Sequence, residues 1–224
     1  MNIPQFLRTI VLAGVALYLM RQVRKPSRWL GRPFAWLMNS SHSALTDWGL
    51  EHATIKPDFA ILDVGCGGGR TIQKLADMAP NGHVSGIDYA AGSVAASRSK
   101  NAELIRAGRV DVQHASVSKL PFPEDQFDLV TAVETQYYWP DLANDMREIL
   151  RVLKPGGTLL VILESYAKGR FGTVQGSVLR LLGGKNLSVE QERELFASAG
   201  YTGVDVFEEK SRGWLCVTGK KPLR

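Results

Sequence analysis

The sequence predicts an α/β fold, built on a doubly wound and mainly parallel sheet. From Phe59 onward, short apolar runs alternate with segments of helical periodicity. The runs are continuously apolar, as strands are when helices cover both faces of a parallel sheet. The last two runs have no helix between them, so we expect an antiparallel hairpin at one edge. Together these patterns predict seven strands in a mainly parallel sheet, with an antiparallel hairpin at its edge.

Each element follows from its own apolar run or helical pattern. Strands are expected at residues 59–64, 83–87, 110–114, 127–133, 158–163, 204–208 and 214–218. Helices are expected at residues 71–78, 90–107, 142–153 and 189–199. Gly108 and Gly200 are typical helix stops, and the run Lys154-Pro-Gly-Gly predicts a sharp turn.

Composition narrows the class of protein. A chain of 224 residues can bury one sizeable core, and 45% hydrophobic with 22% charged residues excludes bulk disorder and a polytopic membrane protein. Cys66 and Cys216 are too few for a disulfide framework and form no zinc-binding cluster with histidines, so no metal is expected. A reducing compartment is the simpler expectation.

Charge is concentrated at the N-terminus. Residues 1–32 hold six basic residues and no acidic one, whereas the whole chain has a net charge of +5, so the remainder is close to neutral. A near-neutral body does not favour a nucleic acid partner. Ile10–Met20 is uncharged and, as a helix, spans roughly 16 Å, about half of a bilayer core.

The basic cluster that follows, Arg21–Lys25, is expected to keep the rest of the chain on the cytoplasmic side. We therefore expect residues 1–25 to attach a cytoplasmic domain to a membrane. A helix packed on the domain or on a second subunit, and a cleaved targeting peptide, remain alternatives. The expected organisation is this N-terminal segment at 1–32, a helical cap at 33–58, and the main domain at 59–224 with a lid insertion at 166–187.

A glycine-rich turn follows the first strand, in the run Asp63-Val-Gly-Cys-Gly-Gly-Gly. Glycine allows positive φ and close approach of a ligand, and the following helix N-terminus favours an anionic group. The dinucleotide fingerprint needs a third glycine at position 70, where this chain has Arg70. Asp88 ends the second strand, where a carboxylate can accept both ribose hydroxyls. A structural turn and a helix N-cap are the respective alternatives, but together loop and acid indicate a nucleoside-bearing cofactor.

Four motifs then resemble the class I S-adenosylmethionine-dependent methyltransferases, of the small-molecule, methyltransferase type 11-like group. They are LDVGCGGGR at 62–70, GIDYA at 86–90, SKLPFPEDQFDLV at 118–130 and ILRVLKPGGTLL at 149–160. The resemblance covers roughly residues 44–165. It implies a Rossmann-like, seven-stranded sheet with an antiparallel last strand, in agreement with the pattern of strands.

The resemblance also implies roles for the loop residues. Asp63, Gly65 and Gly67 match the loop that holds the methionine part of S-adenosylmethionine, and Asp88 matches the acid that binds its ribose.

Further matches concern the adenine and the reactive centre. Tyr89 would lie against the adenine, and the backbone of Val117 would bind its edge. Ser116 stands where the family often has an aspartate for the adenine amine, which implies a weaker side-chain contact. Glu134 matches a position whose carbonyl often meets the amine of the cofactor.

The acceptor side carries three adjacent aromatic residues, Tyr137, Tyr138 and Trp139. They can form an apolar or cation-binding wall, with Tyr138 expected as a core residue. His42 and Glu134 are the candidate acid–base groups, although an ordinary capping or surface role is the alternative for His42. Glu134 and Tyr137 complete the candidate catalytic set.

The sequence therefore predicts methyl transfer from S-adenosylmethionine to a small-molecule acceptor by direct displacement. The absence of a strong acid–base constellation favours a thiol, an amine or an activated carbon or oxygen, and a membrane-associated N-terminus would suit a lipophilic acceptor. A non-catalytic cofactor-binding protein and a nicotinamide-dependent oxidoreductase are the competing interpretations.

Overall fold

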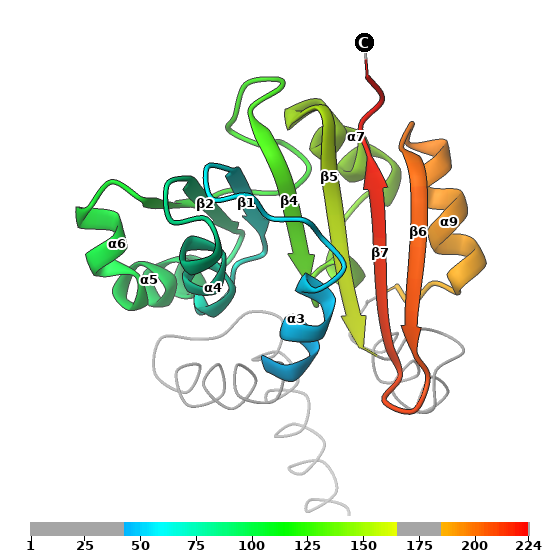
Figure 1. Ribbon diagram of the computed structural model, residues 1–224, viewed down its shortest axis with the longest axis horizontal. Helices are drawn as coiled ribbons and strands as arrows, with labels where there is room; N and C mark the ends of the chain where they lie inside the picture. Colours follow the sequence, from blue (N-terminus) through cyan, green and yellow to red (C-terminus); the bar gives the residue numbers. More distant parts are fainter. Residues whose placement is uncertain (1–42, 165–184, 224) are drawn as a thin grey trace, which may run out of the picture.

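The computed structural model describes residues 43–164 and 185–223, which form a seven-stranded sheet with helices on both faces (Figure 1). The strands are β1 Ala60–Val64, β2 His83–Asp88, β3 Val110–His114, β4 Phe127–Val133, β5 Leu153–Glu164, β6 Thr202–Glu209 and β7 Trp214–Lys220. The helices are α3 Ser43–Leu50, α4 Arg70–Met78, α5 Ala91–Lys100, α6 Ala102–Arg106, α7 Leu142–Val152 and α9 Val189–Ser198, with a 3₁₀ turn, η1, at Gln136–Tyr138.

The strand order is β3-β2-β1-β4-β5-β7-β6. β1 to β5 pair in parallel, and β7 pairs antiparallel with both β5 and β6. The predicted fold class is therefore confirmed, including the antiparallel last strand. β1 and β4 lie at the point where the strand order reverses, which is where open α/β sheets bind ligands at the carboxyl ends of their strands.

Two apolar clusters, one on each face of the sheet, explain why the strands lack polar alternation. On β5, Leu159, Val161 and Leu163 join the cluster that includes residues of α7 and α9. The residues between them, Leu160 and Ile162, join the cluster that includes residues of α3, α4 and α5. Successive side chains point to opposite faces, so a strand buried on both sides needs apolar residues throughout.

Two predicted elements differ from the structure. The helix expected at residues 90–107 is interrupted at Asn101, whose backbone (φ −102°, ψ 21°) ends α5 and precedes α6. The sharp turn expected at residues 154–157 lies inside β5, where the pairing with β4 is irregular between Phe127 and Leu129. Gly156 has φ +78°, which lets the extra residues leave the regular pairing without ending the strand.

Parts of the predicted organisation lie outside the described residues. These are the N-terminal segment, the first part of the expected cap, His42, and residues 166–184 of the expected lid. α3 belongs to the expected cap and packs against β5 and β7. No helix within residues 43–164 and 185–223 is long and apolar enough to cross a bilayer.

Candidate functional site

The glycine loop begins where β1 ends and closes onto the end of β2. The N–H groups of Gly65 and Cys66 both donate to the Ile87 carbonyl, at 2.8 and 2.9 Å. Gly65 has φ +75°, and a Cβ at this position would lie 2.4 Å from the side chain of Thr135. The loop therefore needs glycine here both for its backbone angle and for space.

Asp88, at the end of β2, holds this loop in place. Its Oδ2 accepts the Gly67 N–H at 3.0 Å, and its Oδ1 accepts the Ala90 N–H at 2.8 Å. The carboxylate is 7% exposed, and burial raises its pKa above the ordinary value although both backbone bonds act in the opposite direction. Each carboxylate oxygen has two lone pairs, so both retain capacity for hydroxyl donors.

Gly67 lies over open space. Its φ is +51°, and a Cβ built on it would meet no atom within 4 Å. Gly69 follows as the N-cap of α4, with φ +77° and no side-chain capping bond. The loop thus combines open space at Gly67 with a helix N-terminus two residues later, and a helix N-terminus favours an anionic ligand group.

Asp63 lies beneath the loop, near the end of β1. It is 2% exposed, and its Oδ1 accepts the Thr131 hydroxyl at 2.8 Å. Its Oδ2 is buried without a hydrogen-bond partner among the described residues. Burial, and to a smaller extent the charge of Asp88, raise the pKa of Asp63 to about 7. A buried carboxylate oxygen without a donor is unfavourable, and a cationic ligand group would supply the missing partner.

The expected adenine-binding residues lie beyond the ends of β2 and β3. Tyr89 is 46% exposed, and its carbonyl lies 2.8 Å from His114 Nε2. Val117 is buried, whereas Ser116 is exposed and its hydroxyl accepts the Ser118 N–H at 3.2 Å. The Ser116 side chain therefore stabilises its own turn, and the aspartate that it replaces has no substitute in this segment.

Glu134 and Tyr137 meet at the ends of β4 and β5. Glu134 has φ +59°, a strained angle for a residue other than glycine. The Tyr137 hydroxyl lies 3.1 Å from Glu134 Oε1 and also within hydrogen-bonding distance of the Glu164 carbonyl. The Glu164 N–H donates to Glu134 Oε1 as well. The structure thus brings together two of the three predicted catalytic residues.

Burial sets the protonation of this pair. It raises the pKa of Glu134 to about 8 and that of Tyr137 well above its ordinary value. Both groups are therefore mainly neutral at pH 7. They can donate or accept hydrogen bonds there, but Glu134 becomes a base only as the pH rises towards 8.

The expectation that Tyr138 is the core aromatic is wrong. Tyr137 and Trp139 are 6% and 5% exposed and belong to the core, whereas Tyr138 is only partly buried. Tyr138 packs against the edge of the cluster that contains Tyr137 and Trp139.

A buried polar pair behind this turn was not predicted. Gln136 Nε2 donates to Glu192 Oε2 on α9 at 3.1 Å. Gln136 is 3% exposed and Glu192 is 1% exposed. Burial raises the pKa of Glu192 to about 7. The Lys185 N–H also donates to the Tyr137 carbonyl, at 2.8 Å. Contacts between such distant segments leave no local pattern in the sequence.

The chain is similar to known methyltransferases in sequence and in fold. Residues 62–161 match the family model described as a methyltransferase domain. A demethylmenaquinone methyltransferase of Listeria monocytogenes is 37% identical over 46% of this chain and 43% of its own length. The chain thus matches less than half of the length of that curated relative.

Two solved structures share the fold. One is a methyltransferase in complex with the Haloferax volcanii Trm112 methyltransferase activator, with TM-score 0.75 and 20% identity over 87% of this chain and 96% of that chain. The other is geranyl diphosphate C-methyltransferase from Streptomyces coelicolor, in complex with S-adenosyl-L-homocysteine, with TM-score 0.69 and 15% identity over 80% of this chain and 76% of that chain.

The domain match covers the glycine loop, Asp88 and the end of β4, and the sheet has seven strands with an antiparallel last strand, as the sequence resemblance implied. Residues 62–161 of the chain therefore match a methyltransferase domain, and the chain is similar there to a demethylmenaquinone methyltransferase.

Proposed function

We propose that the protein transfers a methyl group from S-adenosylmethionine to a small-molecule acceptor. The observation that carries this proposal is the pair of buried carboxylates at the glycine loop. Asp63 Oδ2 lacks a donor, and Asp88 bonds the loop through Gly67, which faces open space. A ligand that carries both a cationic amine and a ribose diol would satisfy both carboxylates, and S-adenosylmethionine has both groups.

We assign each residue the role that its position allows. Asp88 would accept the ribose hydroxyls, and Asp63 would neutralise the amino group of the methionine part. The exposed ring of Tyr89 would contact one face of the adenine, while the Val117 backbone would bond its edge. The strained backbone of Glu134 would aim its carbonyl at the cofactor amine.

The bound cofactor supplies an electrophilic methyl group on a sulfonium. The protein has to hold the acceptor atom, the methyl carbon and the sulfur in line, and such alignment can account for a large part of the rate. Glu134 and Tyr137 are neutral at pH 7, so there they would orient the acceptor rather than remove its proton. This favours an acceptor that is already nucleophilic, such as a thiol, an amine or an activated carbon.

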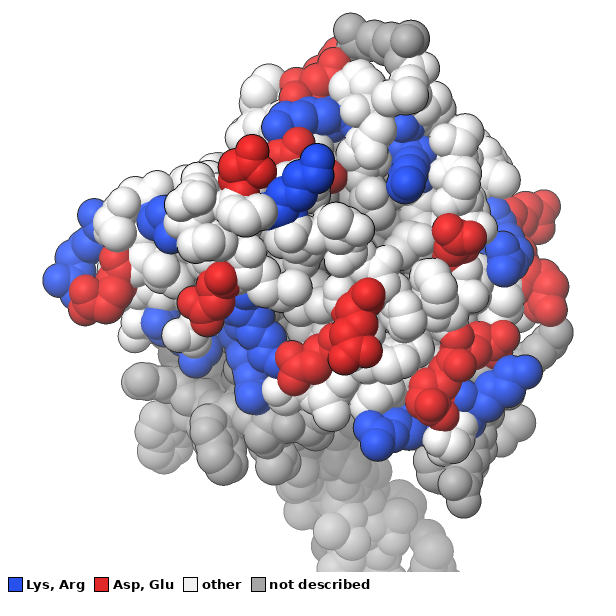
Figure 2. All heavy atoms as spheres, in the orientation of Figure 1, with Lys and Arg blue, Asp and Glu red and all other residues white. Residues whose placement is uncertain are grey.

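A lipophilic acceptor with an activated carbon fits best. The Listeria relative is named for demethylmenaquinone, and the Streptomyces structure for C-methylation of geranyl diphosphate. The apolar and basic residues 1–25 would attach the enzyme to the cytoplasmic face of a membrane, where such acceptors dissolve. Acidic and basic side chains are interspersed on the face in Figure 2, which does not favour a nucleic acid acceptor.

The activity can be tested by methyl transfer from isotopically labelled S-adenosylmethionine. The acceptor panel would hold a short-chain prenylated 1,4-naphthoquinol, an alkyl thiol, an aryl amine and a catechol, and Asp88→Ala would be the control. We expect labelled product with at least one member and a large loss in the variant. Cofactor binding without transfer to any member of a broad panel would favour the non-catalytic alternative.

The membrane part of the proposal needs a separate experiment. The full chain and a variant lacking residues 1–32 would be mixed with vesicles containing anionic lipid and separated by flotation. We expect only the full chain to float, and less of it at high salt, because the basic cluster is attracted to anionic lipid. Equal behaviour of both proteins would contradict this attachment.

A further inference from the structure

A buried polar cluster supports the glycine loop from the side of α5. Asn101, at the break between α5 and α6, is 2% exposed. Its Nδ2 donates to the Gly69 carbonyl at 2.9 Å and to the Ser97 carbonyl at 3.0 Å. The first bond joins residues 32 positions apart and links the helix break directly to the last glycine of the loop.

The loop lies directly on this cluster. A Cβ on Gly69 would be 2.4 Å from both Asn101 Nδ2 and Ser97 Oγ. The Cys66 thiol also contacts Ser97 Oγ, at 3.8 Å. Close packing against Asn101 and Ser97 therefore explains why position 69 needs glycine, independently of its φ of +77°.

The bond to Gly69 has a consequence for ligand binding. A trans peptide directs its N–H opposite to its C=O. Holding the Gly69 carbonyl towards Asn101 therefore turns the Arg70 N–H, the first of α4, away from Asn101. The orientation of this peptide determines how the N-terminus of α4 meets an anionic ligand group.

Stability alone does not account for asparagine at this position. Asn101 Oδ1 is buried without a hydrogen-bond partner among the described residues. A buried carbonyl oxygen without a donor is unfavourable for folding. Only the amide N–H₂ of Asn101 makes side-chain hydrogen bonds among the described residues. These bonds hold the backbone carbonyls of Gly69 in the loop and of Ser97 near the end of α5.

We propose that Asn101 is a positioning residue that holds the glycine loop in its cofactor-binding geometry before the cofactor arrives. It acts through Gly69 and does not itself contact the ligand. This inference rests on the proposed function, because it concerns the binding of S-adenosylmethionine at that loop.

Asn101→Ala and Asn101→Asp test the proposal in complementary ways. The first removes both the N–H₂ donor and the unpaired oxygen. The second keeps the shape of the side chain and replaces the donor with a carboxylate that faces two carbonyls. The probe is S-adenosylhomocysteine, measured by calorimetry at a temperature where each variant is folded.

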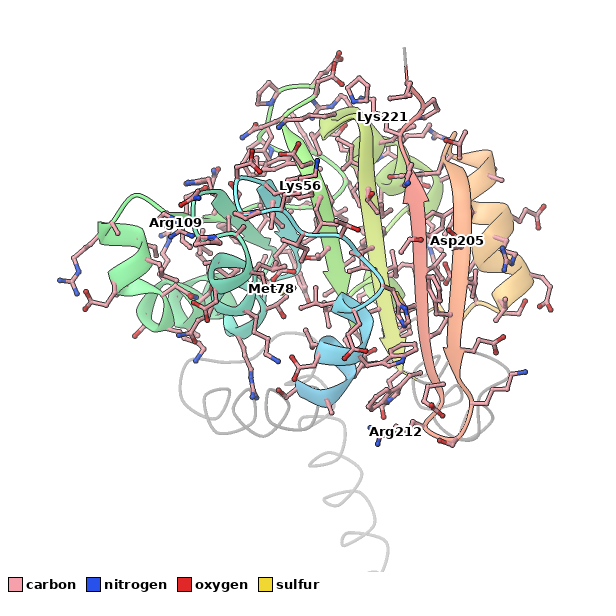
Figure 3. The ribbon with its side chains drawn as sticks, viewed as in Figure 1. Lys56, Met78, Arg109, Asp205, Arg212 and Lys221 are labelled. Atoms are coloured by element: carbon pink, nitrogen blue, oxygen red, sulfur yellow. The ribbon has the colours of Figure 1, made fainter. Side chains whose placement is uncertain are left out.

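Arg109→Ala is the matched control. Arg109 also fixes backbone carbonyls at α4, but at its far end, where it donates to Ala76, Ala79 and Gly82 at 2.7–3.0 Å. It lies at the amino end of β3, opposite the edge towards which β4 and β5 point (Figure 3). Its loss should lower thermal stability without reaching the loop.

We expect both Asn101 variants to bind S-adenosylhomocysteine about tenfold more weakly than the wild type, and Arg109→Ala to bind it within about twofold. Hydrogen exchange should become faster at residues 65–70 in the Asn101 variants, whereas a general loss of stability would speed exchange throughout. Asn101→Ala is expected to fold even if Asn101→Asp does not, because it leaves no unpaired polar group of its own.

Unchanged affinity in folded Asn101→Ala would overturn the proposal, as would an equal loss of affinity in Arg109→Ala. Failure of the wild type itself to bind would instead contradict the proposed function, so the two failures are distinguishable.

Discussion

Gly67 and Gly108 form a matched pair that separates backbone strain from ligand contact. Their φ angles are +51° and +70°, and a Cβ on either would meet no atom within 4 Å. Alanine at either site should therefore cost about 1–2 kcal/mol in folding free energy, because positive φ is unfavourable for a residue with a Cβ. Only Gly67 is bonded to Asp88 and lies over the space assigned to the cofactor.

Gly67→Ala should thus weaken the binding of S-adenosylhomocysteine by about 2 kcal/mol, roughly thirtyfold, since its methyl group enters the space of the ligand. Gly108→Ala should leave the affinity unchanged. Thermal unfolding would check that both variants lose similar stability, and calorimetry would give the affinities. If the two variants bound the ligand equally well, the assignment of this space to the cofactor would be refuted.

Three further predictions concern carboxylates. Asp88→Ala should reduce the affinity for S-adenosylhomocysteine by about 2 kcal/mol by calorimetry, through loss of the ribose acceptor and of the Gly67 bond; unchanged affinity would contradict this. Burial raises the pKa of Glu192 from 4.5 to about 7, so the folded protein favours the protonated carboxyl. The contribution of this carboxyl to stability is fully present below pH 4.5 and is lost as the pH rises through 7. Glu192→Gln keeps a hydrogen-bond partner for Gln136 but does not titrate. The free energy of unfolding of the variant, relative to that of the wild type, should therefore rise by up to about 3 kcal/mol between pH 5 and 8, measured by denaturant unfolding; a difference that does not change with pH would contradict this. If Glu134 removes a proton from the acceptor, kcat/KM should rise with a midpoint near pH 8 and lose this dependence in Glu134→Gln, whereas an identical profile in the variant would exclude that role.

The framework of the fold was predictable because it depends on local patterns. Continuous apolar runs identify the strands, and strand β3 and strand β4 begin and end at the predicted residues. The position of the loop follows from the same pattern, since Asp63 and Asp88 lie at the ends of neighbouring strands and such ends meet at one edge of a sheet.

The remaining details depend on partners that are distant in the sequence. At the interruption of the helical pattern, the Asn101 side chain bonds the carbonyl of Ser97, four residues earlier, and that of Gly69 in the loop. The neutral state of Glu134 depends on burial and on contacts with β5. The pairing of Gln136 with Glu192 arises only when α9 packs behind the turn.

Cofactor identity can be tested by calorimetric titration of the full chain with S-adenosylhomocysteine, with a nicotinamide dinucleotide titrated in parallel. We expect saturable binding of one S-adenosylhomocysteine per chain and no binding of the dinucleotide. No binding of S-adenosylhomocysteine at high micromolar concentration, together with binding of the dinucleotide, would contradict the assignment of the glycine loop and Asp88 to S-adenosylmethionine and favour the oxidoreductase interpretation.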